Sequence, residues 1–364
     1  MIKRIPTRQI KVGNVPIGND APIAVQSMTN TDTRDVPATV AQILRLEEAG
    51  CEIIRVAVPD LEAARAIRAI RDRITIPLIA DIHFDYRLAV ASMENGAQGI
   101  RINPGNIGGP EKLGKVVDAA KVHQVPIRVG VNSGSVEKDI LARHGHPTPE
   151  ALVESAIRNI RLLENLHFFE QKISIKSSDT LTTIDAYRLL SSQCDYPLHL
   201  GVTEAGGLIA GTVKSSVALG MLLYQGIGDT FRISLTRDPV EEVRVAFELL
   251  RCLRIRERGP ELVSCPTCGR CQINLFSLAE KVEEHIQRMD TPLKVAVMGC
   301  VVNGPGEARE ADIGLAGGNG VGIIFKKGQL YKKVPEDQLL AVFIEELDAM
   351  ARERSEELEV RSEK

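Results

Sequence analysis

Eight short runs of apolar and β-branched residues alternate with eight amphipathic stretches over the first 250 residues of the chain. The apolar runs are Ile23–Ser27, Ile53–Val58, Pro77–Asp81, Gly99–Asn103, Ile127–Asn132, Ile173–Ser177, Leu198–Thr203 and Phe231–Leu235. The amphipathic stretches are Val40–Glu48, Leu61–Arg71, Tyr86–Glu94, Pro110–Lys121, Glu150–Leu166, Thr182–Ser192, Thr212–Gln225 and Pro239–Leu250. Short apolar runs are typical of strands buried on both faces, and apolar residues three and four apart indicate helices. A strand followed by a helix, repeated eight times, predicts a (β/α)8 TIM barrel.

A doubly wound open sheet is the alternative arrangement of alternating strands and helices. Such sheets usually have fewer strand–helix units and carry a glycine-rich loop after the first strand. Neither a GxGxxG nor a P-loop sequence follows a predicted strand in this chain. We therefore expect the closed barrel.

The pattern changes after Cys252, where a charged connector containing Gly259 and Pro260 begins. Beyond it the sequence predicts a helix near Leu275–Arg288, a strand over Lys294–Met298, strand-like runs at Ile313–Ala316 and Gly322–Lys326, and a helix over Pro335–Arg354. A chain of 364 residues is longer than one hydrophobic core usually supports. We therefore predict a TIM-barrel domain over residues 1–255 and a small α/β domain that binds an iron–sulfur cluster over residues 256–364.

The expectation of a cluster comes from four cysteines in the second domain. Cys265, Cys268 and Cys271 are each separated by two residues, and Cys300 follows at a distance. Thiolates at this spacing can converge on one metal centre, and soft sulfur ligands select zinc, copper(I) or an iron–sulfur cluster. A zinc ribbon needs a second Cys-x-x-Cys hook or two histidines, and the nearby His285 faces no obvious site. The spacing favours iron–sulfur, with zinc, a thiol–disulfide pair and unliganded thiols in a turn as alternatives.

Glu307 follows the turn-forming residues Asn303, Gly304, Pro305 and Gly306. Glycine and proline in such a turn let the backbone approach a bulky inorganic group closely. A carboxylate beside soft sulfur donors would be a mismatched, weakly held ligand. The other interpretation of Glu307 is a solvated acidic residue after a turn.

Five basic residues lie within or directly beside the predicted barrel strands, where apolar side chains are the rule. They are Arg55, Arg101, Arg128, Lys176 and Arg232. A paired core cation would explain any one of them, but five on different strands favour an inward-facing anion site. Guanidinium groups bind phosphate oxygens in pairs, so a diphosphate is the natural ligand, although a sugar phosphate would fit as well.

Other polar residues accompany these cations at the predicted carboxyl ends of the strands, where TIM barrels place their active sites. Asp81, Asn132 and Glu204 end three of the strands and would face the same mouth. The glycines Gly206–Gly207 and Gly226–Gly228 flank the seventh and eighth strands, where barrels commonly bind phosphate.

Composition and hydropathy exclude several other classes of protein. The net charge is −3, tryptophan is absent and aromatic residues make up 4%, which argues against nucleic-acid binding. No window holds the ~18 apolar residues of a membrane span, and no apolar run of signal-peptide length opens the chain. Seven cysteines without a secretion signal predict a reducing, cytoplasmic location.

Six motifs carry a resemblance to a known family. CPTC, GCVVNGPGE, QSMTNTDTRD, ADIHFDYR, RINPGNIG and GVTEAGG together resemble the bacterial 4-hydroxy-3-methylbut-2-enyl diphosphate synthases. These enzymes are cluster-dependent reductases of the non-mevalonate isoprenoid pathway. The resemblance extends from about Arg4 to about Gly318.

The resemblance implies the reaction. It is the two-electron reductive ring opening and dehydration of 2-C-methyl-D-erythritol 2,4-cyclodiphosphate to (E)-4-hydroxy-3-methylbut-2-enyl diphosphate. The glutamate of the TEAG motif, Glu204, belongs to the active site. We expect Glu204 to donate a proton, and Asp81 and Asn132 to contact substrate hydroxyls.

The resemblance also implies the cofactor and the partners. Each chain would hold one 4Fe–4S cluster on Cys265, Cys268, Cys300 and a labile Glu307, which makes Glu307 both a ligand and a catalytic residue. Flavodoxin or ferredoxin would supply electrons, and in a homodimer the cluster domain of one chain would cap the barrel of the other.

Cys271 departs from the family pattern, and it could replace Glu307 as the fourth ligand.

Two other classes of function stay open. One is a TIM-barrel enzyme that acts on a phosphorylated small molecule and has a structural domain stabilised by zinc. The other is a metal-dependent binding or scaffold protein.

Overall fold

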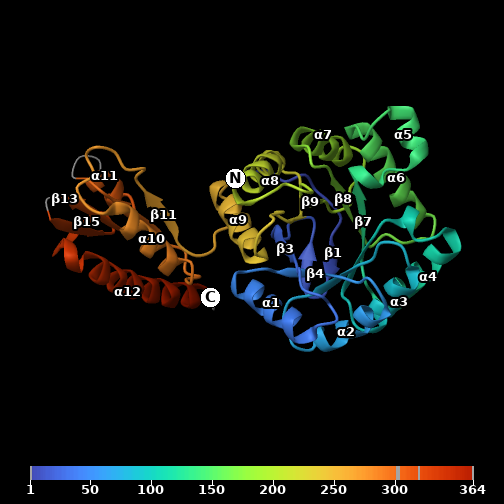
Figure 1. Ribbon diagram of the computed structural model, residues 1–364, viewed down its shortest axis with the longest axis horizontal. Coiled ribbons are helices and arrows are strands. Elements are labelled where there is room, and N and C mark those ends of the chain that lie inside the picture. Colours follow the sequence, from blue (N-terminus) through green and yellow to red (C-terminus); the bar gives the residue numbers. More distant parts are fainter. Residues whose placement is uncertain (1, 301–303, 319, 363–364) are drawn as a thin grey trace. The chain divides into compact units, whose positions relative to one another are not determined.

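The computed structural model describes residues 2–300, 304–318 and 320–362, and the chain divides into two compact units between Arg256 and Glu257 (Figure 1). The first unit contains eight parallel strands in one sheet, in the order β8-β7-β6-β5-β4-β3-β10-β9. A parallel bridge between Ile173 and Leu198 joins the two ends of this order and closes the sheet. The predicted TIM barrel is confirmed.

The barrel elements follow the predicted alternation closely. Its strands are β3 (Ala24–Met28), β4 (Ile53–Ala57), β5 (Leu78–Asp81), β6 (Gly99–Ile102), β7 (Ile127–Asn132), β8 (Gln171–Lys176), β9 (His199–Leu200) and β10 (Thr230–Phe231). The helices that follow them are α1 (Val36–Glu48), α2 (Leu61–Arg71), α3 (Tyr86–Glu94), α4 (Pro110–His123), α6 (Pro149–Glu164), α7 (Thr180–Ser191), α8 (Leu208–Tyr224) and α9 (Pro239–Cys252). A short helix that the sequence did not indicate, α5 (Lys138–His144), precedes α6.

Aspartates start five of the helices that leave the carboxyl ends of the strands. Each accepts a hydrogen bond from a backbone N–H in the first turn, which satisfies a group that the helix itself cannot. They are Asp35, Asp60, Asp85, Asp179 and Asp238. These caps set where each strand–helix loop ends, and the loops surround the mouth of the barrel.

A hairpin of β1 (Ile10–Val12) and β2 (Val15–Ile17) covers the opposite end of the barrel, and the sequence analysis missed it. Its side chains Ile10, Val12 and Ile17 form a buried cluster with residues at the amino ends of β3, β4 and β5. The base of the barrel is therefore packed, and a site must lie at the other end.

The glycines before β10 belong to this packed base, so the prediction of a phosphate site around Gly226–Gly228 was wrong. Gly226 has φ +79°, and a Cβ there would come within 2.2 Å of the carbonyl oxygen of Lys3. The N–H of Ile5 donates to the carbonyl of Gly226. Gly226 thus lets the N-terminal segment pack closely against the turn before β10, and Gly228 makes room for the side chain of Leu200.

The second unit is a five-stranded mixed sheet in the order β11-β12-β13-β14-β15. Its strands are β11 (Glu261–Ser264), β12 (Lys294–Met298), β13 (Ile313–Gly318), β14 (Val321–Lys326) and β15 (Gln329–Pro335). The helices α10 (Leu275–Ile286) and α12 (Glu336–Ser362) share one hydrophobic cluster with the sheet, whereas α11 (Gly304–Arg309) contributes to a second one. The predicted small α/β domain is confirmed; the edge strands β11 and β15 were missed, and α12 continues beyond the predicted end at Arg354.

Gly304, Pro305 and Gly306 lie in the helix α11 and not in the predicted turn. Gly304 opens α11, and a Cβ on it would lie 3.0 Å from Cβ of Met298 and 3.2 Å from Cβ of Ala316. This glycine therefore permits close packing of α11 on β12 and β13. Asn303, the first residue of the predicted turn, lies outside the described residues. Within the described part of the chain, no helix is long and apolar enough to cross a membrane.

Candidate active site and candidate metal centre

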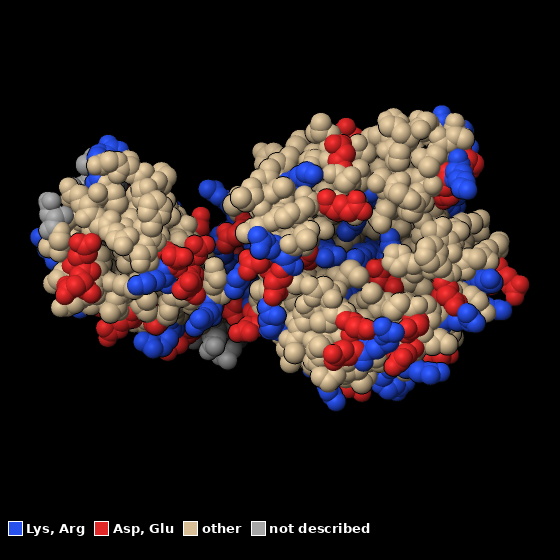
Figure 2. Space-filling view, viewed as in Figure 1, with Lys and Arg blue, Asp and Glu red and all other residues tan. Residues whose placement is uncertain are grey.

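The five predicted cations come from five strands and gather at the carboxyl end of the barrel. Arg55 is on β4, Arg101 on β6 and Arg128 on β7; Lys176 ends β8, and Arg232 directly follows β10. Arg55, Arg101 and Arg128 are 8%, 7% and 2% exposed. Figure 2 shows Lys and Arg side chains inside a hollow on the displayed face of the barrel unit. Alternation along each strand explains the gathering, because every second side chain points into the barrel.

Asp81, at the end of β5, lies between two of these cations. Its carboxylate is 3.6 Å from Nε of Arg55 and 3.3 Å from Nη1 of Arg101. Burial alone would raise the pKa of Asp81, but Arg55, a hydrogen bond from His83, and Arg101 together hold that pKa well below its ordinary value. Asp81 is therefore ionised and fixes two guanidinium groups in place.

Glu242 holds the cation on the other side of the mouth, and the sequence analysis missed it. Its carboxylate accepts hydrogen bonds from Nε and Nη2 of Arg232, at 2.9 and 2.8 Å, and it is 2% exposed. Ser27 and the backbone N–H of Leu235 donate to the same carboxylate. Helical periodicity could have indicated this role, because Glu242 lies on the buried face of α9 together with Ala246.

Arg128 and Lys176 have no carboxylate within ion-pair distance among the described residues. Burial, followed by the nearby Arg55 and Arg101, lowers the pKa of Arg128 well below its ordinary value. Burial, followed by Arg128, does the same to the pKa of Lys176. Two cations without a counter-ion, next to others that are paired, form a site that is short of negative charge. The arrangement is suited to binding a multiply charged anion.

Two glycines make room for these long side chains. A Cβ on Gly130 would lie 2.3 Å from Nε of Arg101, and a Cβ on Gly201 would lie 2.7 Å from Nζ of Lys176. Both glycines occupy strand or strand-end positions where a side chain would fill the mouth. Because neither glycine has a side chain, Arg101 and Lys176 have room to extend across the barrel.

Asn132 ends β7, and Glu204 lies in the loop between β9 and α8. Glu204 is exposed and has φ +52°, a left-handed backbone conformation that is unusual for glutamate. Such strain is concentrated at functional sites. The sequence analysis left His83 out of the site. Its Nε2 atom lies 3.7 Å from Oδ2 of Asp81, and its Nδ1 atom lies 3.5 Å from Nη1 of Arg101.

We expect Asp81→Asn to destabilise the barrel, because it leaves Arg55 and Arg101 without their buried counter-ion. The free energy of unfolding should fall by about 3–5 kcal/mol. Adding pyrophosphate should restore part of this loss by supplying negative charge at the same place. Thermal unfolding with and without pyrophosphate measures both effects, with the exposed Asp72→Asn as control. Equal melting temperatures for the wild type and Asp81→Asn would contradict the prediction.

The candidate metal centre lies at the carboxyl ends of β11 and β12, which are parallel neighbours. Cys265 directly follows β11, and Cys300 follows β12 after one glycine. The loop between them returns to this edge, since the N–H of Gln272 donates to the carbonyl of Gly299. A backbone N–H and then the guanidinium of Arg270 lower the pKa of Cys268, which favours the thiolate that metals bind.

Cys271 differs from the other three cysteines in its surroundings. Its thiol donates to the carbonyl oxygen of Ile273 at 3.3 Å, and a Cβ on Gly299 would lie 2.5 Å from its sulfur. Like Cys265, it packs against the apolar cluster of the second unit. Glu307 lies in the first turn of α11 and is exposed. Among the residues that the structure describes, no three His, Cys, Asp or Glu side chains are close enough together to hold a metal ion.

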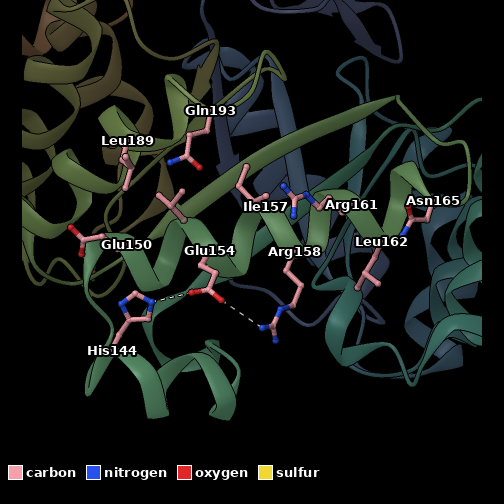
Figure 3. Close-up of a pocket in the computed structure, with 11 residues that line it drawn as sticks. His144, Glu150, Glu154, Ile157, Arg158, Arg161, Leu162, Asn165, Leu189 and Gln193 are labelled. Atoms are coloured by element: carbon pink, nitrogen blue, oxygen red, sulfur yellow. Dashed lines mark hydrogen bonds and ion pairs between the residues drawn. The ribbon is translucent and has the colours of Figure 1, made fainter.

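A groove of about 830 Å³ on the outer side of the barrel lies among α5, α6 and α7 (Figure 3). Its charged side chains neutralise one another: Glu154 is 3.0 Å from Nε2 of His144 and 3.7 Å from Nη2 of Arg158. The groove contains none of the strand-end residues. It is therefore a weaker candidate than the barrel mouth.

Two family models match the chain. The GcpE TIM-barrel domain matches residues 7–247, and the GcpE protein C-terminal domain matches residues 261–349. Both matches fall inside the two structural units.

Curated relatives match almost the whole chain, and three of them carry the name "4-hydroxy-3-methylbut-2-en-1-yl diphosphate synthase (flavodoxin)". The protein of Desulfotalea psychrophila is 71% identical, over 97% of this chain and 98% of its own. That of Caldanaerobacter subterraneus is 60% identical, over 97% of this chain and 100% of its own, and that of Geobacter sulfurreducens is 58% identical, over 96% and 99%.

Solved structures similar to this chain include a dihydropteroate synthase from Xanthomonas albilineans, with 16% identity and a TM-score of 0.47 over 68% of this chain and 98% of that chain. The family that the six sequence motifs suggested is confirmed by the family models and the relatives. The chain belongs to the GcpE family, that of the flavodoxin-type 4-hydroxy-3-methylbut-2-en-1-yl diphosphate synthases.

Proposed function

We propose that this chain carries out the reaction of its family at the mouth of the barrel. The substrate is 2-C-methyl-D-erythritol 2,4-cyclodiphosphate, and the product is (E)-4-hydroxy-3-methylbut-2-enyl diphosphate. One observation carries the assignment of the site: five cations face two carboxylates, and Arg128 and Lys176 have no carboxylate of their own. A diphosphate supplies the missing charge.

The cations have two tasks in this proposal. Arg55, Arg101, Arg128, Lys176 and Arg232 bind the phosphate oxygens and orient the ring. When the ring opens, the phosphate that leaves carbon gains one negative charge. Cations that are already in place stabilise this charge without rearranging, which lowers the barrier.

The carboxylates and the amide act on the carbon skeleton. The substrate dianion, two electrons and one proton give the product trianion and one water. Glu204, exposed in the loop that follows β9, donates that proton to the departing hydroxyl. Asp81 accepts hydrogen bonds from substrate hydroxyls and also keeps Arg55 and Arg101 aligned, whereas the amide of Asn132 can accept from or donate to these hydroxyls.

A 4Fe–4S cluster, one per chain, fits the donors at the edge of β11 and β12. Cys265, Cys268 and Cys300 would hold it, with Glu307 as a labile fourth ligand. The Cys268 thiol with its lowered pKa and the convergence of the loop on Gly299 support this choice. When bound, the cluster supplies single electrons and an iron with an exchangeable ligand. The hydrogen bond from Cys271 to a carbonyl supports a structural role for that thiol.

Reduced flavodoxin or ferredoxin is the electron donor that we propose, in a reducing cytoplasm. The relatives carry flavodoxin in their name. The test is turnover of the cyclic diphosphate by protein purified without oxygen, with reduced flavodoxin. A colourless protein with stoichiometric zinc and no turnover would contradict the proposal.

The connector between the units supports a homodimer in which each cluster domain caps the partner's barrel. Arg256 pairs with Glu52 at 2.8 Å and donates to the carbonyl of Ile23, which anchors the connector at the amino ends of β4 and β3. Arg258 already pairs with Asp290 of the second unit. The part of the connector that is not held by these ion pairs is thus very short. The distance from the base of the barrel to its mouth is set by the strands, and a strand of six residues such as β7 is roughly 20 Å long. Reaching the mouth of its own barrel is difficult for a domain tethered at the base.

An apolar stripe on α8 offers a surface for the second copy. The stripe comprises Ile209, Val213, Val217, Met221 and Tyr224, which are between 40% and 82% exposed. Their spacing of three and four residues places them on one face. Only Lys214 is charged among the 17 residues of α8. A helix on the outside of a monomeric barrel should have a polar outer face, so the stripe favours contact with another chain.

Charges introduced into the α8 stripe should prevent dimer formation. We expect the double variant Val213→Glu, Val217→Glu to be monomeric and to lose at least about 100-fold in turnover, because no partner caps the barrel. Sedimentation velocity measures the mass, and Val122→Glu, on the exposed side of α4, is the control. A dimeric, fully active double variant would contradict this interface.

A further inference from the structure

Arg128 is one of the cations of the mouth, and it also belongs to a buried polar layer inside the barrel that contains Gln26, Lys172 and His199. Each of these side chains is at most 2% exposed. TIM barrels usually fill such positions with branched apolar residues. Polar atoms of all four have no hydrogen-bond partner among the described residues: both amide atoms of Gln26, Nε and Nη1 of Arg128, Nζ of Lys172 and Nε2 of His199. Buried polar atoms are rarely left in this state without a reason.

Lys172 is the most unusual member of this layer. It lies on β8 as the register partner of Arg128 on β7, so the two basic side chains are direct neighbours. The nearest buried carboxylate towards the base, Asp229, is already engaged. Its oxygens accept hydrogen bonds from Arg4 at 2.5 Å, Thr7 at 3.0 Å and the N–H of Leu198 at 2.8 Å. Lys172 therefore has a cation beside it and no available anion below it.

The electrostatic surroundings of Lys172 agree with this geometry. Burial, followed by the charge of Arg128, lowers the pKa of Lys172 well below its ordinary value; Asp229 opposes this shift and Arg55 adds to it. In the free protein, burial and the neighbouring Arg128 thus disfavour the charged form of the amine. The ionisable groups that face it from the surrounding strands are Arg55, Arg128, Lys176, His199 and Asp229.

We propose that Lys172 is a positioning residue that takes up a proton when a diphosphate binds to Arg128 beside it. This inference rests on the diphosphate site proposed above. A bound diphosphate neutralises the cations that keep the Lys172 amine uncharged, so the protonated form becomes favourable. The new ammonium group then adds one positive charge beneath the phosphates, acting through Arg128 and without touching the substrate.

The additional proton on Lys172 supplies positive charge that the reaction requires. Opening of the cyclic diphosphate converts a dianion into a trianion, so the demand for positive charge increases during turnover. A lysine that is neutral in the empty barrel avoids the cost of a further buried cation when no anion is present. The same lysine, once protonated, stabilises the more highly charged product diphosphate.

Calorimetric titration with inorganic pyrophosphate tests the proposal on the full chain. Titrations at pH 8 in buffers of different ionisation enthalpy count the protons taken up per pyrophosphate bound. We expect Lys172→Met to take up about one proton less than the wild type, since methionine fills the space and cannot titrate. The difference between the two proteins cancels the titration of pyrophosphate itself.

The pH dependence of binding gives a second measurement. The pyrophosphate affinity of the wild type should decrease by up to about tenfold per pH unit as pH rises through the pKa of Lys172 in the complex, and Lys172→Met should lack this component. Lys172→Gln serves if the methionine variant does not fold, and the exposed Lys115→Met is the control. Equal proton counts and equal pH profiles in wild type and variant would overturn the inference.

The outcomes separate this inference from the proposed site. If pyrophosphate does not bind the wild type, or if Arg128→Met does not weaken binding, the diphosphate site itself is wrong. If binding depends on Arg128 but the Lys172 variants keep the wild-type proton count, only the role of Lys172 is wrong.

Discussion

Replacing Cys265, Cys268 or Cys300 by alanine, one at a time, is expected to remove the iron–sulfur cluster and abolish turnover of the cyclic diphosphate. A cluster needs three or four firm ligands, and the fourth proposed ligand, Glu307, is a carboxylate that binds iron weakly beside sulfur. Losing one thiolate leaves too few firm donors. Iron and sulfide content, with Mössbauer spectra of protein purified without oxygen, measure the cluster, and turnover should fall below detection.

Cys271→Ala is the matched control for these three variants. Its thiol donates to the carbonyl of Ile273, so we expect the iron content to be retained. Glu307→Ala should keep the cluster but change the signal of one iron and reduce turnover. If Cys271→Ala loses the cluster and Glu307→Ala leaves every iron signal unchanged, the fourth ligand is sulfur and the proposed ligand set is wrong.

Arg128→Met is expected to have the second largest effect, a fall in kcat/KM of about 10²–10³-fold. Arg128 is the buried guanidinium without a carboxylate partner, so its interactions become complete only when the diphosphate is present. Removing it takes away both binding and stabilisation of the charge that develops on ring opening. Steady-state kinetics with the cyclic diphosphate and binding of pyrophosphate measure the two contributions.

The stability of Arg128→Met should change in the opposite direction from its activity. A buried cation without a counter-ion destabilises the empty barrel, so its replacement by an apolar side chain should raise the melting temperature. Arg244→Met, which removes an exposed arginine paired with Glu241, is the control and should leave kinetics unchanged. A variant with wild-type kcat/KM would show that Arg128 does not contact the diphosphate.

The barrel itself could be predicted from the sequence because the patterns that indicate its strands and helices lie within short stretches of the chain. Buried parallel strands require apolar runs, and the helices that cover them require apolar residues three and four apart; both patterns are visible without any contact. For the same reason the end of each strand, and with it Asp81 and Arg101, could be placed at the mouth. The short edge strand β11 was missed because its residues are only partly buried and lack a clear alternation.

The cations and cysteines are also visible in the sequence, since a basic residue in a buried strand and a tight run of cysteines are rare. Their partners are not visible. Glu242 lies ten residues after Arg232 but 215 residues after Ser27, and only closure of the barrel brings Ser27 to this pair. His83 was passed over because nothing local distinguishes a histidine at the mouth from one at the surface.

The sequence alone therefore determined the two-domain architecture, the family and the identities of the candidate ligands, because these depend on residue type and spacing along the chain. The tertiary structure alone decided which cations have counter-ions, that Lys172 is buried beside Arg128, and that the connector is anchored at the base of the barrel. Those properties depend on strand register and on ring closure, which bring distant residues to within a few ångströms. Charge balance inside a barrel is a sum over all its strands, and no single stretch of sequence contains it.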